Sequence, residues 1–316
     1  MSALLSLFLI VLPVFLVVGA GYAAVRVRAF PDAGVDALVK FATTIAVPVL
    51  LFRAIYDLDL ARALEPGLLA SFYIGALVSF ALATLTARKL FGRRPGEAVA
   101  VGFCALFSNS VLLGLPIVER AYDDAVMQAA FAIIAFHAPF GYLVGITTME
   151  FARRDGAGLG ATVRRVADAM FHNALTIGIV AGFAANLSGL TLPEPATAAV
   201  DLLARAGLPV ALFALGGVLT RYRPQAALFE AGMATAFSTL AHPAVAWVLA
   251  TQVFALPSDF TRAAVLIAAM PTGVNGYIFA AMYDRAVPVA ASTVLIATAT
   301  SVLSITFWLW VLGGGL

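Results

Sequence analysis

The chain has 316 residues, of which 62% are hydrophobic and only 11% are charged, and its formal net charge is +2. Soluble domains carry about 25% charged residues, so this chain has too few charges to cover a water-exposed surface. The small net charge gives no sign of a nucleic-acid partner, and none is expected. Apolar runs long enough to cross a bilayer core of roughly 30 Å recur from end to end, which predicts an all-α polytopic membrane protein.

Ten membrane-spanning helices are predicted in chain order. They cover about residues 3–25, 35–56, 67–87, 97–119, 125–149, 168–187, 198–220, 227–254, 261–283 and 287–312. The first run has no Lys or Arg before its apolar segment and is too long for a signal peptide, so we expect a retained helix. The longest polar stretch is expected to be a loop.

Two short motifs recur at a single offset. AGYAA at 20–24 returns as AGFAA at 181–185, and VPVLLF at 47–52 returns as LPVALF at 208–213, both 161 residues later. Adding 161 to the first five spans gives the last five. Because each copy holds an odd number of spans, the second must enter the membrane inverted, as is typical of secondary transporters. The predicted organisation is a first five-helix repeat at 1–150, a cytoplasmic loop at 151–165 and an inverted five-helix repeat at 166–316.

Basic residues are distributed unequally between the two sides. Connections after the odd-numbered spans carry 14 of the 19 Lys and Arg residues, and those after the even-numbered spans carry 4. The positive-inside rule therefore predicts that both termini lie on the non-cytoplasmic side of a plasma membrane, here a bacterial inner membrane. The remaining residue, Arg205, lies in the seventh span four residues after Asp201, and the two are expected to form a local ion pair.

The fourth and ninth predicted spans carry loop-forming residues at their centres. Residues 107–116 read FSNSVLLGLP and residues 270–279 read MPTGVNGYIF, each within a stretch free of charge. Proline removes a helix hydrogen bond and glycine permits unusual dihedrals, so both helices should break there. Backbone groups freed by a break cannot face lipid and must be buried or line a cavity. An ordinary proline kink is the alternative, but matched breaks in two repeats point to a transporter's substrate site.

Broken helices that cross near the midplane direct two half-helix N-termini, each worth roughly +0.5 charge, toward a common point. With amides and hydroxyls but no fixed charge, the site is predicted to take a small anion, since hard cations prefer carboxylates. No metal or other cofactor is expected. The predicted substrate-binding residues are Ser108, Asn109, Ser110, Gly114, Pro116, Pro271, Thr272, Gly273 and Asn275. Thr43 and Thr44 are added from the second span, which matches the seventh in carrying a proline; a packing role is their alternative.

His137 lies near the middle of the fifth span, in AFHAPFGY. An ionisable residue within a membrane is a functional candidate by default, and a histidine can carry a proton at physiological pH. A neutral histidine that is hydrogen-bonded to a neighbouring helix is the structural alternative. His137 is therefore the proton-coupling candidate, with the second reading kept open.

The motifs SNSVLLGLP, MPTGVNGYIFA and HNALTIGIVAG, together with the ten-span plan, resemble the auxin efflux carrier family, which includes bacterial malonate-type transporters and plant auxin carriers. The resemblance implies a fold like that of bile acid symporters and sodium–proton antiporters. Spans 1, 2, 6 and 7 would form a scaffold, and spans 3–5 and 8–10 a core in which helices 4 and 9 cross. It also implies a homodimer through the scaffold and an elevator-type movement of the core in the lipid bilayer.

The favoured function is secondary active or facilitative transport of a small organic carboxylate, with a malonate-like dicarboxylate ahead of an indole-type monocarboxylate. A sodium–proton antiporter would need acidic residues within the membrane, and an intramembrane enzyme would need a nucleophile and base or metal ligands; the sequence supplies neither. A transporter-derived sensor without flux remains the second alternative. Outward movement of an anion is driven by an inside-negative potential, whereas uptake requires coupling, for which protons are favoured.

Overall fold

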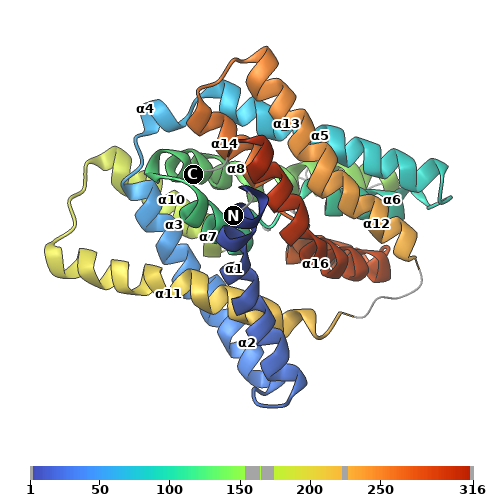
Figure 1. Ribbon diagram of the computed structural model, residues 1–316, viewed down its shortest axis with the longest axis horizontal. Helices are drawn as coiled ribbons and strands as arrows, with labels where there is room; N and C mark the ends of the chain where they lie inside the picture. The colour runs from blue at the N-terminus through green and yellow to red at the C-terminus, as the bar shows by residue number, and fades with distance from the viewer. Residues whose placement is uncertain (1–2, 154–163, 165–173, 223–226, 314–316) are drawn as a thin grey trace.

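The computed structural model describes residues 3–153, 164, 174–222 and 227–313, and every extended regular element in these ranges is a helix (Figure 1). Seven helical segments within them are long and apolar enough to cross a membrane: Leu4–Arg26, Asp32–Tyr56, Pro66–Lys89, Asp124–Ala152, Glu194–Leu219, Leu228–Val253 and Val287–Val311. The all-helical polytopic membrane fold predicted from composition is thereby confirmed.

The seven long segments contain most of the helical elements. These are α1 (Ala3–Arg26); α2 (Asp32–Phe41), η1 (Ala42–Ala46) and α3 (Val47–Tyr56); α5 (Pro66–Lys89); α8 (Asp124–Arg153); α11 (Glu194–Leu219); α12 (Leu228–Ala236), η3 (Phe237–Ala241), α13 (His242–Val248) and η4 (Leu249–Val253); and α16 (Val287–Val311). A short helix, α4 (Leu60–Ala63), follows α3.

The other predicted spans appear as shorter helices. The fourth consists of α6 (Pro95–Leu106), η2 (Ser110–Gly114) and α7 (Leu115–Ala121), and the ninth of α14 (Ser258–Ala268) and α15 (Val274–Met282). Both are interrupted where the sequence predicts a break. The sixth is described as α10 (Ala174–Ser188); its first predicted residues, 168–173, and most of the loop at 151–165 lie outside the described residues.

Prolines explain three of the four π-helical turns among the residues that the structure describes. Each of η1, η2 and η3 ends two residues before a proline, namely Pro48, Pro116 and Pro243. A proline lacks the N–H group and clashes with the carbonyl four residues earlier, and a widened turn relieves that clash. At Pro243 the carbonyl affected is that of Thr239, and it accepts a hydrogen bond from the indole nitrogen of Trp308 at 2.9 Å.

Glycines allow two helix pairs to pack at unusually short range. A methyl group on Gly216 of α11 would lie 1.9 Å from the carbonyl oxygen of Val18 in α1, and one on Gly21 would lie 2.0 Å from that of Phe213. Between α10 and α3, a methyl group on Gly182 would lie 2.9 Å from the carbonyl oxygen of Phe52. Small residues at such contacts are what lets membrane helices approach closely.

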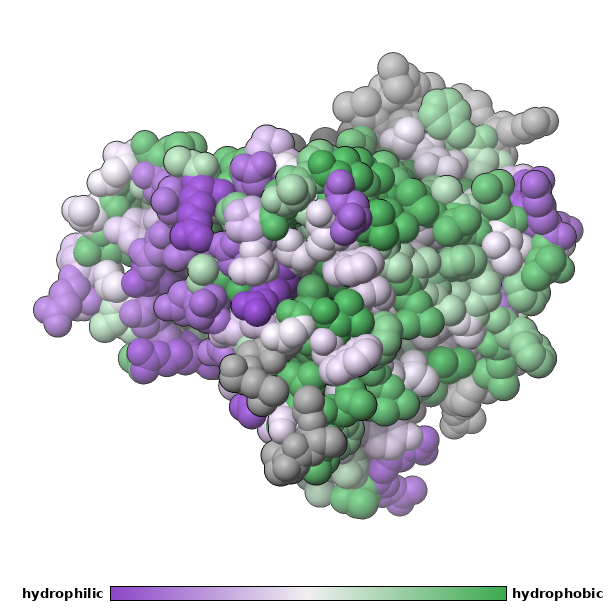
Figure 2. All heavy atoms as spheres, turned by 45° about the horizontal axis from the view of Figure 1, so that its top comes forward, coloured by the Kyte–Doolittle hydropathy of each residue, from purple (hydrophilic) through white to green (hydrophobic). Residues whose placement is uncertain are grey.

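Figure 1 shows α3, α10 and α11 together at the lower left, with α5, α6 and α12 on the opposite side. The N-terminal helix α1 packs against α11 of the first group and also against α7 and α16. Hydrophobic side chains cover a broad part of the face seen in Figure 2, whereas hydrophilic ones gather mainly toward one side. A surface of this kind fits a chain whose helices are surrounded by lipid.

Ion pairs join different helices near their ends. The predicted local pair of Asp201 with Arg205 is wrong: the Asp201 carboxylate accepts a hydrogen bond from Nε of Arg53 in α3 at 2.8 Å. Arg53 also contacts Asp57. Just beyond α11, Arg221 donates to Asp36 in α2 at 2.6 Å, and this hydrogen bond raises the pKa of its guanidinium. Packing of α11 against α2 and α3 therefore decided these partners.

Candidate substrate-binding site

The two interrupted helices meet at their breaks. Ser108 and Thr272 form an isolated antiparallel bridge. The Asn109 N–H donates to the Pro271 carbonyl at 2.7 Å, and the Gly273 N–H donates to the Phe107 carbonyl at 3.0 Å. Each break thus satisfies backbone groups that the other has freed, which removes the cost of exposing them at membrane depth.

Four predicted site residues shape these breaks but do not line the cavity beside them: Gly114, Pro116, Pro271 and Thr272. The hydroxyl of Thr272 is fully buried and donates to the Cys104 carbonyl at 2.6 Å. Gly114 packs closely against Met270: a methyl group added at Gly114 would lie 3.1 Å from the Met270 side chain. These residues hold the crossing together from behind the cavity.

The other predicted residues come together around one cavity of about 510 Å³, a volume typical of small-molecule sites. These are Thr43, Thr44, Ser108, Asn109, Ser110, His137, Gly273 and Asn275. One wall consists of residues from α2, η1, α3, α10 and α11; the other consists of both breaks, α8 and α15. No lining residue in the described ranges is Asp, Glu, Lys or Arg, and these ranges hold no cluster of metal-ligating side chains.

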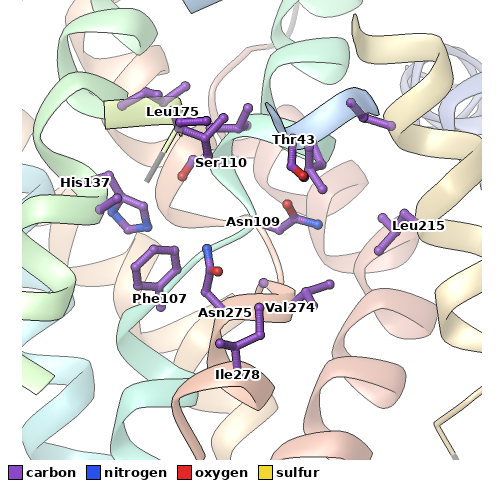
Figure 3. Close-up of a pocket in the computed structure, with 18 of the residues that line it drawn as sticks. Thr43, Phe107, Asn109, Ser110, His137, Leu175, Leu215, Val274, Asn275 and Ile278 are labelled. Carbon is purple, nitrogen blue, oxygen red and sulfur yellow. The ribbon is translucent and has the colours of Figure 1, made fainter. Parts of the chain in front are cut away.

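Two asparagine amides project into the middle of the cavity (Figure 3). Asn109 immediately precedes η2, and its side chain makes no hydrogen bond within the described part of the protein. Asn275 lies in the first turn of α15, and its Oδ1 is 3.3 Å from the hydroxyl of Tyr142 in α8. The first N–H groups of a helix have no partner within it, so both amides lie where the backbone favours negative charge.

The hydroxyl protons of both threonines are used within their own helix. Thr43 donates its hydroxyl to the Val39 carbonyl at 2.8 Å, and Thr44 donates to the Lys40 carbonyl at 2.6 Å. Each hydroxyl has a single proton, so both present only lone pairs to the cavity. Ser110 likewise donates to the Ser108 carbonyl at 3.3 Å. The donors that remain in the described lining are therefore the two amides, the Ser108 hydroxyl and the helix N–H groups.

His137 is buried behind the fourth-span break. Its Nε2 lies 3.2 Å from the Ser108 carbonyl oxygen, which can only accept, so Nε2 carries the proton and donates. The imidazole lies against the rings of Phe72 and Phe107, at centroid distances of 5.4 and 4.6 Å. The alternative to proton coupling, a neutral histidine that is hydrogen-bonded to a neighbouring helix, requires such a hydrogen bond. Proton coupling through His137 stays a prediction.

Several lining residues are not among those predicted from the sequence. They are Tyr142 and the apolar residues Leu175, Leu215 and Ile278, of which the last three are labelled in Figure 3. Hydrophobic periodicity offers no signal for them, because in a membrane the lipid-facing and protein-facing sides of a helix are both apolar. Only the packing of the helices identifies the side that faces the cavity.

Comparisons with known proteins agree with this architecture. The family described as "Membrane transport protein" matches residues 6–158 and 163–309, which is nearly the whole chain. A Rhizobium meliloti (strain 1021) protein named "Putative malonate transporter" is 25% identical over 308 residues, covering 97% of this chain and 96% of that protein. The protein therefore belongs to the membrane transport protein family, that of the auxin efflux carriers.

Proposed function

We propose that this protein is a secondary active or facilitative transporter of a small organic carboxylate, with a malonate-like dicarboxylate favoured. The observation that carries the proposal is the cavity at the paired breaks, which offers amide and helix N–H donors and, in the described lining, no charged side chain. Such a cavity binds an anion by dipoles and hydrogen bonds. The name of the Rhizobium meliloti relative supports the same substrate class.

A dicarboxylate matches the arrangement of donors. Asn109 precedes the first N–H groups of η2, and Asn275 lies among those of α15, so the cavity has two donor sets. A ligand with two carboxylates joined by a short linker can engage both sets, whereas a monocarboxylate engages one. An indole-type monocarboxylate exporter is the alternative, supported by the apolar side chains that make up most of the lining.

The proposed fold is a pair of inverted five-helix repeats, 1–150 and 166–316, that resembles the bile acid symporters. The glycine contacts support it, because the contact of Gly21 with the Phe213 carbonyl has a counterpart in that of Gly182 with the Phe52 carbonyl. Both residues in one contact are related to those in the other by the offset of 161, as a duplicated chain requires. The paired breaks would then be the crossing of helices 4 and 9.

Movement of the core against a scaffold is the proposed mechanism. Helices α1, α3, α10 and α11 of the proposed scaffold pack on one another, as do α5, α6, α8, α13 and α14 of the proposed core. Because the cavity lies between the two groups, displacement of the core would carry the substrate-binding breaks across the membrane. We further propose a homodimer through the scaffold helices, as in the family that the sequence resembles.

We propose that both termini face outward and that the described conformation opens to the cytoplasm. Two of the residues that line the cavity lie close in sequence to basic residues, which the positive-inside rule assigns to the cytoplasmic side. Thr43 is near Lys40, and Val218 is near Arg221. In inside-out membrane vesicles, Val218→Cys is expected to react with a membrane-impermeant maleimide, whereas Phe254→Cys should react in intact cells. The single native cysteine, Cys104, is fully buried and should not react with the maleimide. Labelling of Val218→Cys exclusively from outside would contradict the orientation.

Coupling determines the direction of transport. Each negative charge that moves outward gains about 2.3 kcal/mol per 100 mV of inside-negative potential, so efflux needs no coupling ion. Uptake would need one, and since the described cavity has no carboxylate for sodium, protons are the proposed coupling ion, with His137 as the candidate carrier.

The proposal is tested by uptake of radiolabelled malonate into proteoliposomes, with empty liposomes as control and a pH gradient or a membrane potential imposed separately. Uptake stimulated by the pH gradient would indicate a proton-coupled importer. Uptake that follows only the potential would indicate an anion uniporter suited to export. An absence of flux for malonate, other dicarboxylates and indole acetate alike would overturn the proposal and favour a sensor without transport.

A further inference from the structure

Tyr142 is held rigidly at the edge of the cavity. It is only 8% exposed, and its ring lies 5.9 Å from that of Phe103 and 5.6 Å from that of Phe107, measured between centroids. Glycines flank it in α8: a methyl group would lie 2.7 Å from Phe107 on Gly141 and 2.5 Å from Phe103 on Gly145. The rings of Phe103 and Phe107 therefore pack against α8 beside Tyr142 and limit the positions that its phenol ring can take.

The hydroxyl of Tyr142 meets one end of the Asn275 amide. Its oxygen lies 3.3 Å from Oδ1, so the tyrosine donates and the amide oxygen accepts. In a rotated amide the NH2 group would donate to the Tyr142 oxygen, and the Tyr142 proton would lose the acceptor that the described structure gives it. An asparagine amide has a donor end and an acceptor end, and fixing one end decides which end a ligand meets.

We propose that Tyr142 is a positioning residue that keeps the NH2 group of Asn275 toward the substrate and thereby gives the cavity a preference for carboxylates over neutral amides. This inference rests on the proposed function. Asn109 has no such partner in the described structure, so its amide can present either end. The hydroxyls of Thr43 and Thr44 donate to carbonyls of their own helix. The orientation of the Asn275 amide therefore strongly affects how many hydrogen-bond donors the cavity offers to a ligand.

The experiment compares dissociation constants for malonate and for malonamide, its neutral analogue, on purified protein in detergent. In Tyr142→Phe the dissociation constant for malonate is expected to rise about 3- to 10-fold, as for the loss of one hydrogen bond. That for malonamide should stay unchanged or fall. Tyr73→Phe is the matched control. The Tyr73 hydroxyl donates at 2.6 Å to the carbonyl of Ile133 in α8, the helix that also holds Tyr142, but Tyr73 does not line the cavity. It should leave the malonate-to-malonamide ratio unchanged.

A second variant, Asn275→Asp, replaces the NH2 group with an oxygen and is expected to abolish malonate binding while retaining malonamide. Two results would overturn the inference. One is an unchanged malonate-to-malonamide ratio in Tyr142→Phe, whether neither ligand or both ligands equally lose affinity, and the other is undiminished malonate binding by Asn275→Asp. In each case the wild type still binds malonate and the proposed function stands. If the wild type binds no member of a carboxylate panel, the proposed function fails and the inference fails with it.

Discussion

Replacing Asn109 with alanine is expected to reduce malonate transport by about 10- to 100-fold while leaving the folded protein intact. Hydrogen bonds to charged groups contribute roughly 1.5–3 kcal/mol each, which corresponds to that range. The Asn109 side chain has no partner in the described structure, so its removal breaks no contact that stabilises the fold. Its backbone N–H, which donates to the Pro271 carbonyl, is retained in the variant.

Asn186→Ala provides the contrasting control. The Asn186 amide nitrogen donates to the carbonyls of Ile55, Tyr56 and Leu58, at 3.1, 2.9 and 2.9 Å, where α3 ends. We expect this variant to lower the apparent melting temperature in detergent, yet to keep malonate affinity per folded molecule. Transport by Asn109→Ala at the wild-type rate, or a loss explained fully by unfolding, would argue against a substrate-binding role for Asn109.

Gly216→Ala is expected to destabilise the fold strongly, because it adds a methyl group at a close contact between α1 and α11. The added methyl would lie 1.9 Å from the Val18 carbonyl oxygen and 2.8 Å from the Tyr22 nitrogen. Both are backbone atoms, so no side-chain rotation can relieve the clash and α1 must move away from α11. Overpacking of this kind costs about 1–3 kcal/mol, and more when a helix must shift.

Gly19→Ala is the matched control, because Gly19 lies on the same helix α1 and has no atom within 4 Å of a methyl group built there. It should be neutral or stabilising by up to about 1 kcal/mol, since alanine favours helix over glycine. Gly182→Ala, with its nearest atom at 2.8 Å, should fall between the two. Apparent melting temperatures of the three purified variants test this order, and equal values for Gly216→Ala and Gly19→Ala would refute it.

The two effects would separate the requirements of folding from those of transport. Gly216 and Asn186 belong to α11 and α10, where close helix packing and a satisfied helix end maintain the arrangement. Asn109 belongs to a break, and its side chain makes no hydrogen bond within the described residues. Variants of the first kind should lower the amount of folded protein, and variants of the second kind should lower turnover at constant amount.

The sequence by itself determined the class of protein and the location of the breaks. A charged fraction of 11% and recurring apolar runs leave only a membrane fold, because polar backbone in lipid must form helices. Proline, glycine and asparagine at membrane depth identified both breaks, since each restricts or frees the backbone locally. Motifs repeated at an offset of 161 predict a duplication without any knowledge of contacts.

Only the tertiary structure decided which partner each polar group found. Asp201 pairs with Arg53 of another helix instead of Arg205 on its own, Thr272 donates to Cys104 behind the cavity, and Tyr142 holds Asn275. These choices depend on helix rotation and crossing, which an all-apolar pattern does not encode because lipid and protein interior are equally apolar. The same reason explains why the apolar cavity residues of α10 and α11 emerged only once the helices were packed.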